Sequence, residues 1–307
     1  MVKGLTKRLF LLAVVGMAVS SVFGQATRSI TVSTEPSASV WIDGVGYGKT
    51  DDKGTLAIKT VAAGAHTLKV RAAGFKEKSQ ALTAVQKGEV KVVLVKTTDE
   101  AELAFQDGER FTTSDRDKAV EAYKKAIKLR PAYPDAFVAM ARVLTDQGNF
   151  DEAQAAIAGA RKVKPVFPEA SAVQGRIFKE GGNEAKAIAA FKRAITEGKG
   201  FQPEAYAGLG LLYKEKGETF GGSGDLDNEK VNYDLAASNL SKSVKQLSGA
   251  PDAIVIYQLL GLVYERQKKT KEAIALYEEF LRVFPDVPEA DAVRSFIVQL
   301  KKPNPDQ

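Results

Sequence analysis

The sequence predicts two domains, a small all-β sandwich followed by an all-α solenoid of about five helical hairpins plus a capping helix. Up to residue 97, apolar and polar residues alternate, and glycine or proline interrupts the chain about every ten residues, which is typical of the short strands of a sandwich. From residue 99 onwards, the apolar residues recur at helical spacing. Pro131 and Pro165 each close a helical pattern and lie 34 residues apart, which indicates a repeated helical hairpin.

Residues 1–24 have the pattern of a secretory signal peptide. Lys3, Lys7 and Arg8 form a basic start, an apolar core runs from Leu9 to Val19, and small residues follow. The core is shorter than a membrane-spanning helix requires, so we expect cleavage, with retention as an anchor as the alternative. We therefore predict an exported protein, periplasmic, extracellular or at the cell surface, without a transmembrane segment after signal cleavage.

Residues 25–97 form the predicted β-domain. Val40 and Ile42 occupy alternate positions before an Asp43-Gly44 turn, as in a β-hairpin. The segment resembles a PEGA domain over about residues 27–96, through turn and corner residues that comprise Pro36, Ser37, Ala38, Asp43, Gly44, Gly48, Lys49, Thr50, Gly64, Gly74 and Phe75. PEGA domains are surface-associated modules of bacterial envelope proteins without known catalysis, so the resemblance implies a place in a bacterial cell envelope or outside the cell.

Residues 99–307 form the predicted α-solenoid. Two of its helices share an aromatic residue, a leucine-glycine pair and a second aromatic at equal spacing, and these residues are Tyr206, Leu209, Gly210, Tyr213, Tyr257, Leu260, Gly261 and Tyr264. Together with the closing prolines, the pattern resembles the tetratricopeptide repeat (TPR) family over about residues 100–302. Five units precede a capping helix at about 289–301. An insertion at about 215–235 lengthens the fourth unit, and its glycines predict a solvated loop that leads into a lengthened helix.

The junction between the two domains is short. Thr97, Thr98 and Asp99 alone separate the last predicted strand from the first predicted helix. Since no flexible linker is present, we expect the β-domain to be held at a fixed angle and to pack on the first helical hairpin.

The TPR resemblance implies a binding groove on the concave surface, which the first helix of each hairpin lines. Such grooves bind extended or helical peptides. The residues of this sequence at the inner positions are the predicted partner contacts, and they are Val138, Arg142, Arg176, Lys179, Leu211, Lys214, Gln258 and Leu262. They predict a groove with an apolar floor and a few cations, which binds a partner protein.

The β-domain is basic, with eleven basic and six acidic residues between positions 28 and 96, in a chain whose formal net charge is +6. The candidate contacts for an anionic envelope surface, whether polymer or lipid, are Lys69, Arg71, Lys76, Lys78, Lys87 and Lys91. The alternative is that lysines on exposed strands only prevent edge-to-edge aggregation.

No catalytic or metal site is expected, and neither is a cofactor. The chain contains no cysteine, and His66 is its single histidine. The stretch GVGYGKT is similar to a phosphate-binding loop, but Asp43 stands where the first glycine is required. We therefore predict a non-catalytic protein–protein interaction scaffold of the bacterial cell envelope or exterior, with no nucleic-acid partner. The alternatives are a self-assembling subunit of a surface or extracellular fibre or oligomer, and a cell-wall glycan hydrolase that uses a carboxylate pair.

Overall fold

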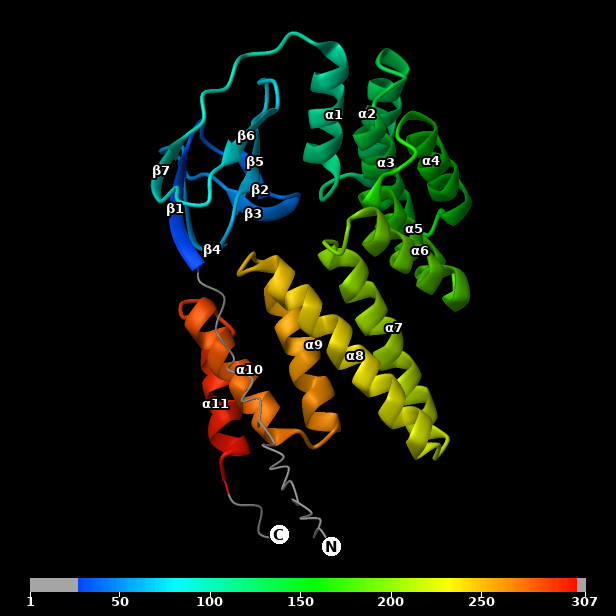
Figure 1. The fold of residues 1–307 in the computed structure, drawn as a ribbon. Coiled ribbons are helices and arrows are strands. Elements are labelled where there is room, and N and C mark those ends of the chain that lie inside the picture. The colour runs from blue at the N-terminus through cyan, green and yellow to red at the C-terminus, as the bar shows by residue number, and fades with distance from the viewer. Residues whose placement is uncertain (1–26, 303–307) are drawn as a thin grey trace, which may run out of the picture.

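The computed structural model describes residues 27–302 and shows a β-sandwich followed by a helical array (Figure 1). A three-stranded sheet has the order β4-β1-β7, and a four-stranded sheet has the order β3-β2-β5-β6. The strands are β1 (Thr27–Ser33), β2 (Ser39–Ile42), β3 (Val45–Lys49), β4 (Thr55–Ala62), β5 (His66–Arg71), β6 (Lys78–Leu82) and β7 (Gly88–Lys91). All neighbouring strands are antiparallel except β1 and β7, which are parallel.

Alternation along β2 orients the four-stranded sheet. Val40 and Ile42 are buried inside the sandwich, so Trp41 between them lies on the outer face. The β2–β3 hairpin turns through Asp43 and Gly44, whose φ angles are 49° and 81°. Two consecutive positive φ angles match the right-handed twist of the flanking strands, and aspartate followed by glycine is a favoured pair for such a turn.

The helical array consists of five antiparallel hairpins and a final helix within the described residues. The helices are α1 (Glu100–Phe111), α2 (Arg116–Leu129), α3 (Pro134–Asp146), α4 (Phe150–Val163), α5 (Pro168–Glu180), α6 (Glu184–Glu197), α7 (Pro203–Gly222), α8 (Leu226–Leu247), α9 (Ala253–Arg266), α10 (Thr270–Val283) and α11 (Ala290–Leu300). The expected fold class is therefore confirmed. None of these helices is both long enough and apolar enough to cross a membrane.

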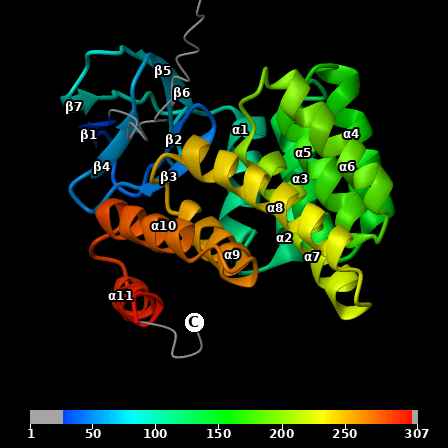
Figure 2. The ribbon, with the colours of Figure 1, turned by 60° about the horizontal axis from the view of Figure 1, so that its bottom comes forward.

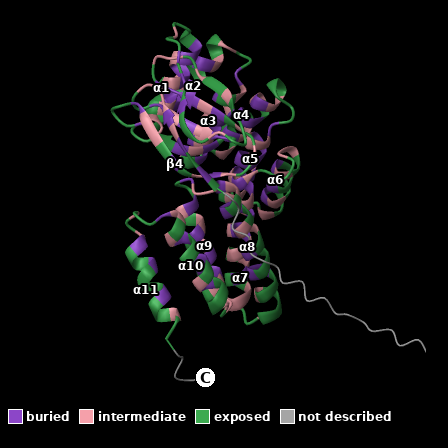
Figure 3. Ribbon diagram, turned by 60° about the vertical axis from the view of Figure 1, so that its left-hand side comes forward, coloured by how far each residue is buried: buried purple, intermediate pink, exposed green. Residues whose placement is uncertain are grey.

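Small residues let the two helices of a hairpin approach closely. A Cβ added at Gly108 would lie 2.5 Å from the Tyr123 ring, and one added at Gly210 would lie 2.6 Å from Leu240. Both distances are shorter than real contacts allow, so these two hairpins require glycine at this position, while the second hairpin accommodates Ala141 there. Figure 3 shows the buried residues gathered inside the sandwich and between packed helices, with exposed residues along the outer side of α11.

The insertion contains the expected lengthened helix, but most of the loop expected before it is helical as well. Residues 215–235 continue α7 and α8 as a helical hairpin, and only three residues, from Ser223 to Asp225, form the turn. Tyr233 is 3% exposed and packs on Gly217, while the Asp225 side chain accepts a hydrogen bond from the Asn228 N–H and so caps α8. The packed ring and the cap make the helical form favourable despite the glycines.

The sandwich lies against the array at two separate places. Figures 1 and 2 show it beside α1 on one side and beside the ends of α8 and α10 on the other. A single buried apolar cluster extends from the sandwich into α8–α11, whereas α1–α4 and the region around α5–α7 have clusters of their own. The array therefore curves around one face of the sandwich.

Candidate functional site: a chamber between the sandwich and the helices

The first contact joins β5 to α1. The Arg71 guanidinium is 8% exposed, forms ion pairs with Glu77 and Glu109, and lies 4.5 Å from the centre of the Phe105 ring. Burial lowers the pKa of Arg71, but Glu109 and Glu77 raise it by more, so the arginine keeps its charge. Burial in turn raises the pKa of Glu109 by more than Arg71 lowers it. A charge-assisted pair in this half-buried place fixes the orientation of the sandwich on α1.

Gln106 adds a second link to α1. Its side-chain oxygen accepts a hydrogen bond from the Gly74 N–H at 2.8 Å, and its amide nitrogen donates to the Phe75 carbonyl at 2.8 Å. One side-chain amide thus satisfies both a backbone donor and a backbone acceptor at the corner after β5. The expectation that the β-domain packs on the first hairpin agrees with these contacts.

The second contact joins the sandwich to the loop between α8 and α9. The Thr60 hydroxyl donates to the Ser248 carbonyl at 2.9 Å, and the Ser248 hydroxyl donates to the Thr60 carbonyl at 3.1 Å. The Tyr47 hydroxyl donates to the Leu247 carbonyl at 3.2 Å, and burial raises the pKa of Tyr47 to about 12. At Gly249, where φ is +80°, an added Cβ would lie 2.0 Å from the Thr60 hydroxyl oxygen. The two surfaces are therefore in close contact.

Between these two contacts lies a chamber of about 810 Å³. One wall is the β2–β3 hairpin, and the other consists of α3, α5, α7, the end of α8 and the start of α9. The lining residues are Trp41, Asp43, Gly44, Val45, Gly46, Arg142, Lys164, Phe167, Pro168, Glu169, Arg176, Phe201, Gln202, Pro203, Glu204, Ala207, Ser243, Leu247, Asp252 and Ile256. Pockets that bind ligands typically measure about 300–1,000 Å³, so the chamber is large enough to serve as one.

The cations of the predicted groove are already paired. Arg142 on α3 donates to both oxygens of Glu204 on α7, at 2.7 and 2.6 Å, and to Glu169 on α5 at 3.3 Å. Burial lowers the pKa of Arg142, and Glu204 and Glu169 raise it by more, which keeps the guanidinium charged. A bidentate pair of this kind fixes three successive first helices relative to one another.

The other predicted groove residues divide into three kinds. The remaining cations also have acidic partners, since Arg176 pairs with Asp146, Lys179 with Glu215 at 3.1 Å and Lys214 with Glu218 at 2.7 Å. Val138 is 1% exposed and packs in the interior, so its side chain does not reach the groove surface. Leu211 is half-buried, and Gln258 and Leu262 are exposed.

Four of the predicted groove residues, together with Glu109 of α1, occupy one column on the inner surface. Glu109, Arg142, Arg176, Leu211 and Leu262 each follow the small residue at which the two helices of a hairpin meet. The first three are charged and paired, with Arg71, Glu204 and Asp146 among their partners. The last two are leucines. Along this column, the inner surface therefore changes from charged and ion-paired at α1, α3 and α5 to apolar at α7 and α9.

The sequence did not point to the aromatic lining. Trp41, Phe167 and Phe201 all border the chamber. A usable signal exists for Trp41, because a large aromatic residue on the polar side of an alternating strand needs a contact outside the sandwich. Phe167 and Phe201 lie just before Pro168 and Pro203, in the connections that lead into α5 and α7, where no periodic pattern applies.

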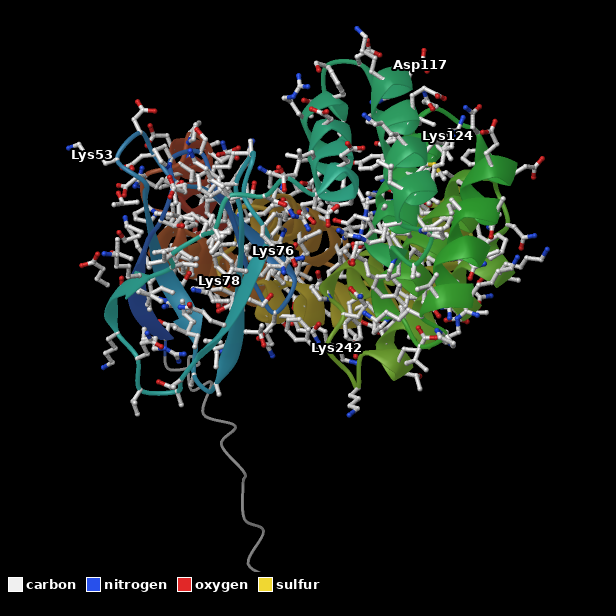
Figure 4. All side chains as sticks on the ribbon, turned by 90° about the horizontal axis from the view of Figure 1, so that it is seen from above. Lys53, Lys76, Lys78, Asp117, Lys124 and Lys242 are labelled. Atoms are coloured by element: carbon white, nitrogen blue, oxygen red, sulfur yellow. The ribbon has the colours of Figure 1, made fainter. Side chains whose placement is uncertain are left out.

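The six predicted anionic-surface residues do not form one face. Arg71 is buried against α1, which corrects the expectation that it is available to a polymer or lipid. The Lys69 ammonium lies 4.9 Å from the Trp41 ring on the face that meets the helices. Exposed lysines remain on or beside the edge strands β6 and β7, at Lys76, Lys78, Lys87 and Lys91. Figure 4 shows Lys76 and Lys78 on the side of the sandwich nearer the helices and Lys53 at its opposite edge.

Comparisons with known proteins identify both domains. Residues 27–98 match the family model of the PEGA domain, and residues 111–177 and 257–286 match models of the tetratricopeptide repeat. The chain thus combines a PEGA domain with tetratricopeptide repeats, and both resemblances seen in the sequence are confirmed.

Solved structures agree with the helical part of this assignment. Yeast Tom70 superposes with a TM-score of 0.52 at 18% identity, over 66% of this chain and 40% of that one. A human IFIT1 dimer with m7Gppp-AAAA gives 0.51 at 17% identity, over 66% and 45%. At these identities the likeness concerns the fold alone. No curated protein matches the sequence.

Proposed function

We propose that this protein is a non-catalytic scaffold that binds a segment of a partner protein on the inner surface of its TPR array, at α7 and α9 and in the adjoining chamber. One observation carries the proposal, namely that the column of inner-surface residues ends in two leucines. Leu262 is 54% exposed, and Val255, two turns away on the same face of α9, is 56% exposed. Apolar side chains exposed together on a concave surface are a usual feature of protein-binding sites.

The apolar surface of α7 and α9 continues into the chamber. Ala207 and Ile256 line the chamber, and Leu211 lies one turn beyond Ala207 on α7. A chain-like ligand that lies along α7 and α9 therefore reaches the β2–β3 hairpin at its other end. This continuity favours a polypeptide segment over a small compact ligand.

Site-specific photocrosslinking in the native host tests the proposal. Benzoylphenylalanine at position 262 is expected to capture a discrete partner protein, whereas the same group at Lys125 on the outer side of α2 captures none. Leu262→Glu is expected to abolish capture from a second inner position, Leu211, without lowering the melting temperature, because residue 262 is exposed. Equal products at 125 and 262 would refute an inner-surface site.

The proposed location is the bacterial cell envelope or exterior. The signal-peptide pattern of residues 1–24, which lie outside the described residues, and the PEGA domain support it. Fractionation of the tagged protein is expected to place it outside the cytoplasm, and removal of residues 1–24 to retain it inside. Recovery of both forms in the cytoplasm would refute the location.

A further inference from the structure

We propose that the chamber binds a peptide segment of neutral or net positive charge, and that Trp41 of the β-domain is one of its contacts. This inference rests on the proposed function and specifies the chemistry of the partner. It also makes the β-domain a part of the binding site.

The β2–β3 hairpin is a fixed wall of the chamber. Arg71 and Gln106 hold one side of the sandwich on α1, and Thr60 and Tyr47 hold the other side on the loop after α8. Opening the chamber would break both sets of contacts. A ligand in the chamber therefore meets the hairpin and the helices together.

Trp41 faces the chamber from the outer side of the sandwich. Its neighbours Val40 and Ile42 are buried inside the sandwich, and its own side chain lines the chamber. The Lys69 ammonium and the Arg71 guanidinium lie 4.9 and 5.4 Å from the indole ring and hold it from the sheet side. A pre-ordered tryptophan at the wall of a cavity provides a large contact area at little entropic cost to the protein.

The charges of the chamber lining favour a basic ligand over an acidic one. The chamber is lined by four acidic residues and three basic ones, and its two arginines, Arg142 and Arg176, are paired with carboxylates. Glu169 is 47% exposed and receives a single bond of 3.3 Å. Within residues 27–302, Asp252 belongs to no ion pair. Among the described cations that line the chamber, Lys164 alone has no carboxylate partner, and its ammonium lies 4.0 Å from the centre of the Phe167 ring. An acidic segment would therefore find one unpaired cation, whereas a lysine or arginine of a partner could pair with Glu169 or Asp252.

The experiment uses Trp41 as the reporter, because it is the only tryptophan of the chain. The full exported protein is titrated with two capped nonapeptides, one with three Leu-Lys-Ser units and one with three Leu-Glu-Ser units, and with chitotetraose. Tryptophan emission and the anisotropy of dye-labelled peptides are measured. We expect a saturable emission change with the lysine peptide, and affinity for the glutamate peptide at least about tenfold weaker.

Variants separate the contributions. Trp41→Ala is expected to weaken binding of the labelled lysine peptide about tenfold, as loss of a central aromatic contact does. The double variant Glu169→Gln and Asp252→Asn is expected to raise its Kd about fivefold, as loss of two partly exposed ion pairs does. Asp117→Asn with Glu121→Gln on the outer side of α2 makes the same charge change and is expected to leave the Kd unchanged.

Three outcomes would overturn the inference. They are equal or tighter binding of the glutamate peptide, an emission change with chitotetraose alone, and no emission change with any probe. If position 262 still captures a partner protein under any of these outcomes, the scaffold function stands and only the assignment of the chamber fails.

Discussion

Replacement of Gly249 by alanine tests whether the sandwich and the array are in direct contact. At this residue φ is +80°, and an added Cβ would lie 2.0 Å from the Thr60 hydroxyl oxygen and 3.0 Å from a methyl group of Val283. The backbone conformation alone costs an L-residue about 1 kcal/mol. The clash also separates Thr60 from Ser248 and breaks their two hydrogen bonds, each of which contributes about 1 kcal/mol. We therefore expect a loss of about 3 kcal/mol in the free energy of unfolding.

Gly224→Ala is the matched control. Gly224 has a φ of +81° but has no atom within 4 Å of an added Cβ, so it reports the backbone cost alone. Urea unfolding followed by circular dichroism is expected to give a loss of about 1 kcal/mol for this variant. Equal losses at the two glycines would refute the contact.

A double-mutant cycle sharpens the same test. Thr60→Ala removes the hydroxyl oxygen that the new methyl group would overlap. In the Thr60→Ala background, Gly249→Ala is expected to cost only about 1 kcal/mol, so the two changes are coupled by about 2 kcal/mol. Additive effects would show that the sandwich and the loop after α8 do not meet in solution.

Three further changes probe other parts of the architecture. Arg71→Met leaves Glu109, whose side chain is 34% exposed, without its partner. The variant is expected to lose about 2 kcal/mol in the free energy of unfolding, measured in urea. An unchanged free energy of unfolding would refute the ion pair between the sandwich and α1. Gly108→Ala places a methyl group 2.5 Å from a tyrosine ring and is expected to cost about 1–3 kcal/mol, while Gly222→Ala, in open space, is expected to cost nothing. The pKa of Tyr47 is about 12 in the docked state and 10.0 ordinarily, so the undocked state loses its proton first as the pH rises. The contact between the sandwich and the loop after α8 is therefore expected to weaken between pH 10 and 12, as measured by amide exchange. Tyr47→Phe is expected to remove this pH dependence. If the pH dependence of exchange is the same in the variant, Tyr47 has no part in the contact.

Local sequence rules predicted most of the fold. Alternation at Val40 and Ile42 located a strand, and Gly210 and Gly261 located the close approach of paired helices, because both patterns arise from neighbours along the chain. For the insertion at 215–235, the sequence predicted the lengthened helix, but its glycines predicted a longer loop before that helix than the structure has. Tyr233 packs on Gly217, sixteen positions earlier, and such a pairing is visible only once the two helices are antiparallel.

The candidate site was only half predictable. Leu211 and Leu262 were identified from the repeat, but Arg142 was interpreted as a partner contact, since its acidic partners Glu169 and Glu204 lie 27 and 62 residues further along the chain. Those two glutamates occupy equivalent positions at the starts of α5 and α7, so comparison between units could have indicated the pairing. Nothing in the local pattern indicates that Thr60 meets Ser248, which is 188 residues away.

The closure of the array on the sandwich determines how the proposed site works. In a solenoid, each hairpin contacts only its neighbours, so small rotations between hairpins add up and the two ends of the array move relative to each other. Here the sandwich contacts α1 at Glu109 and the loop after α8 at Ser248, which belong to the first and fourth hairpins. These two contacts limit how far the intervening helices can open or close. The chamber walls are thus in place before a ligand arrives, and no binding free energy is spent on ordering them. Loss of either contact should therefore weaken partner binding even when every lining residue is intact.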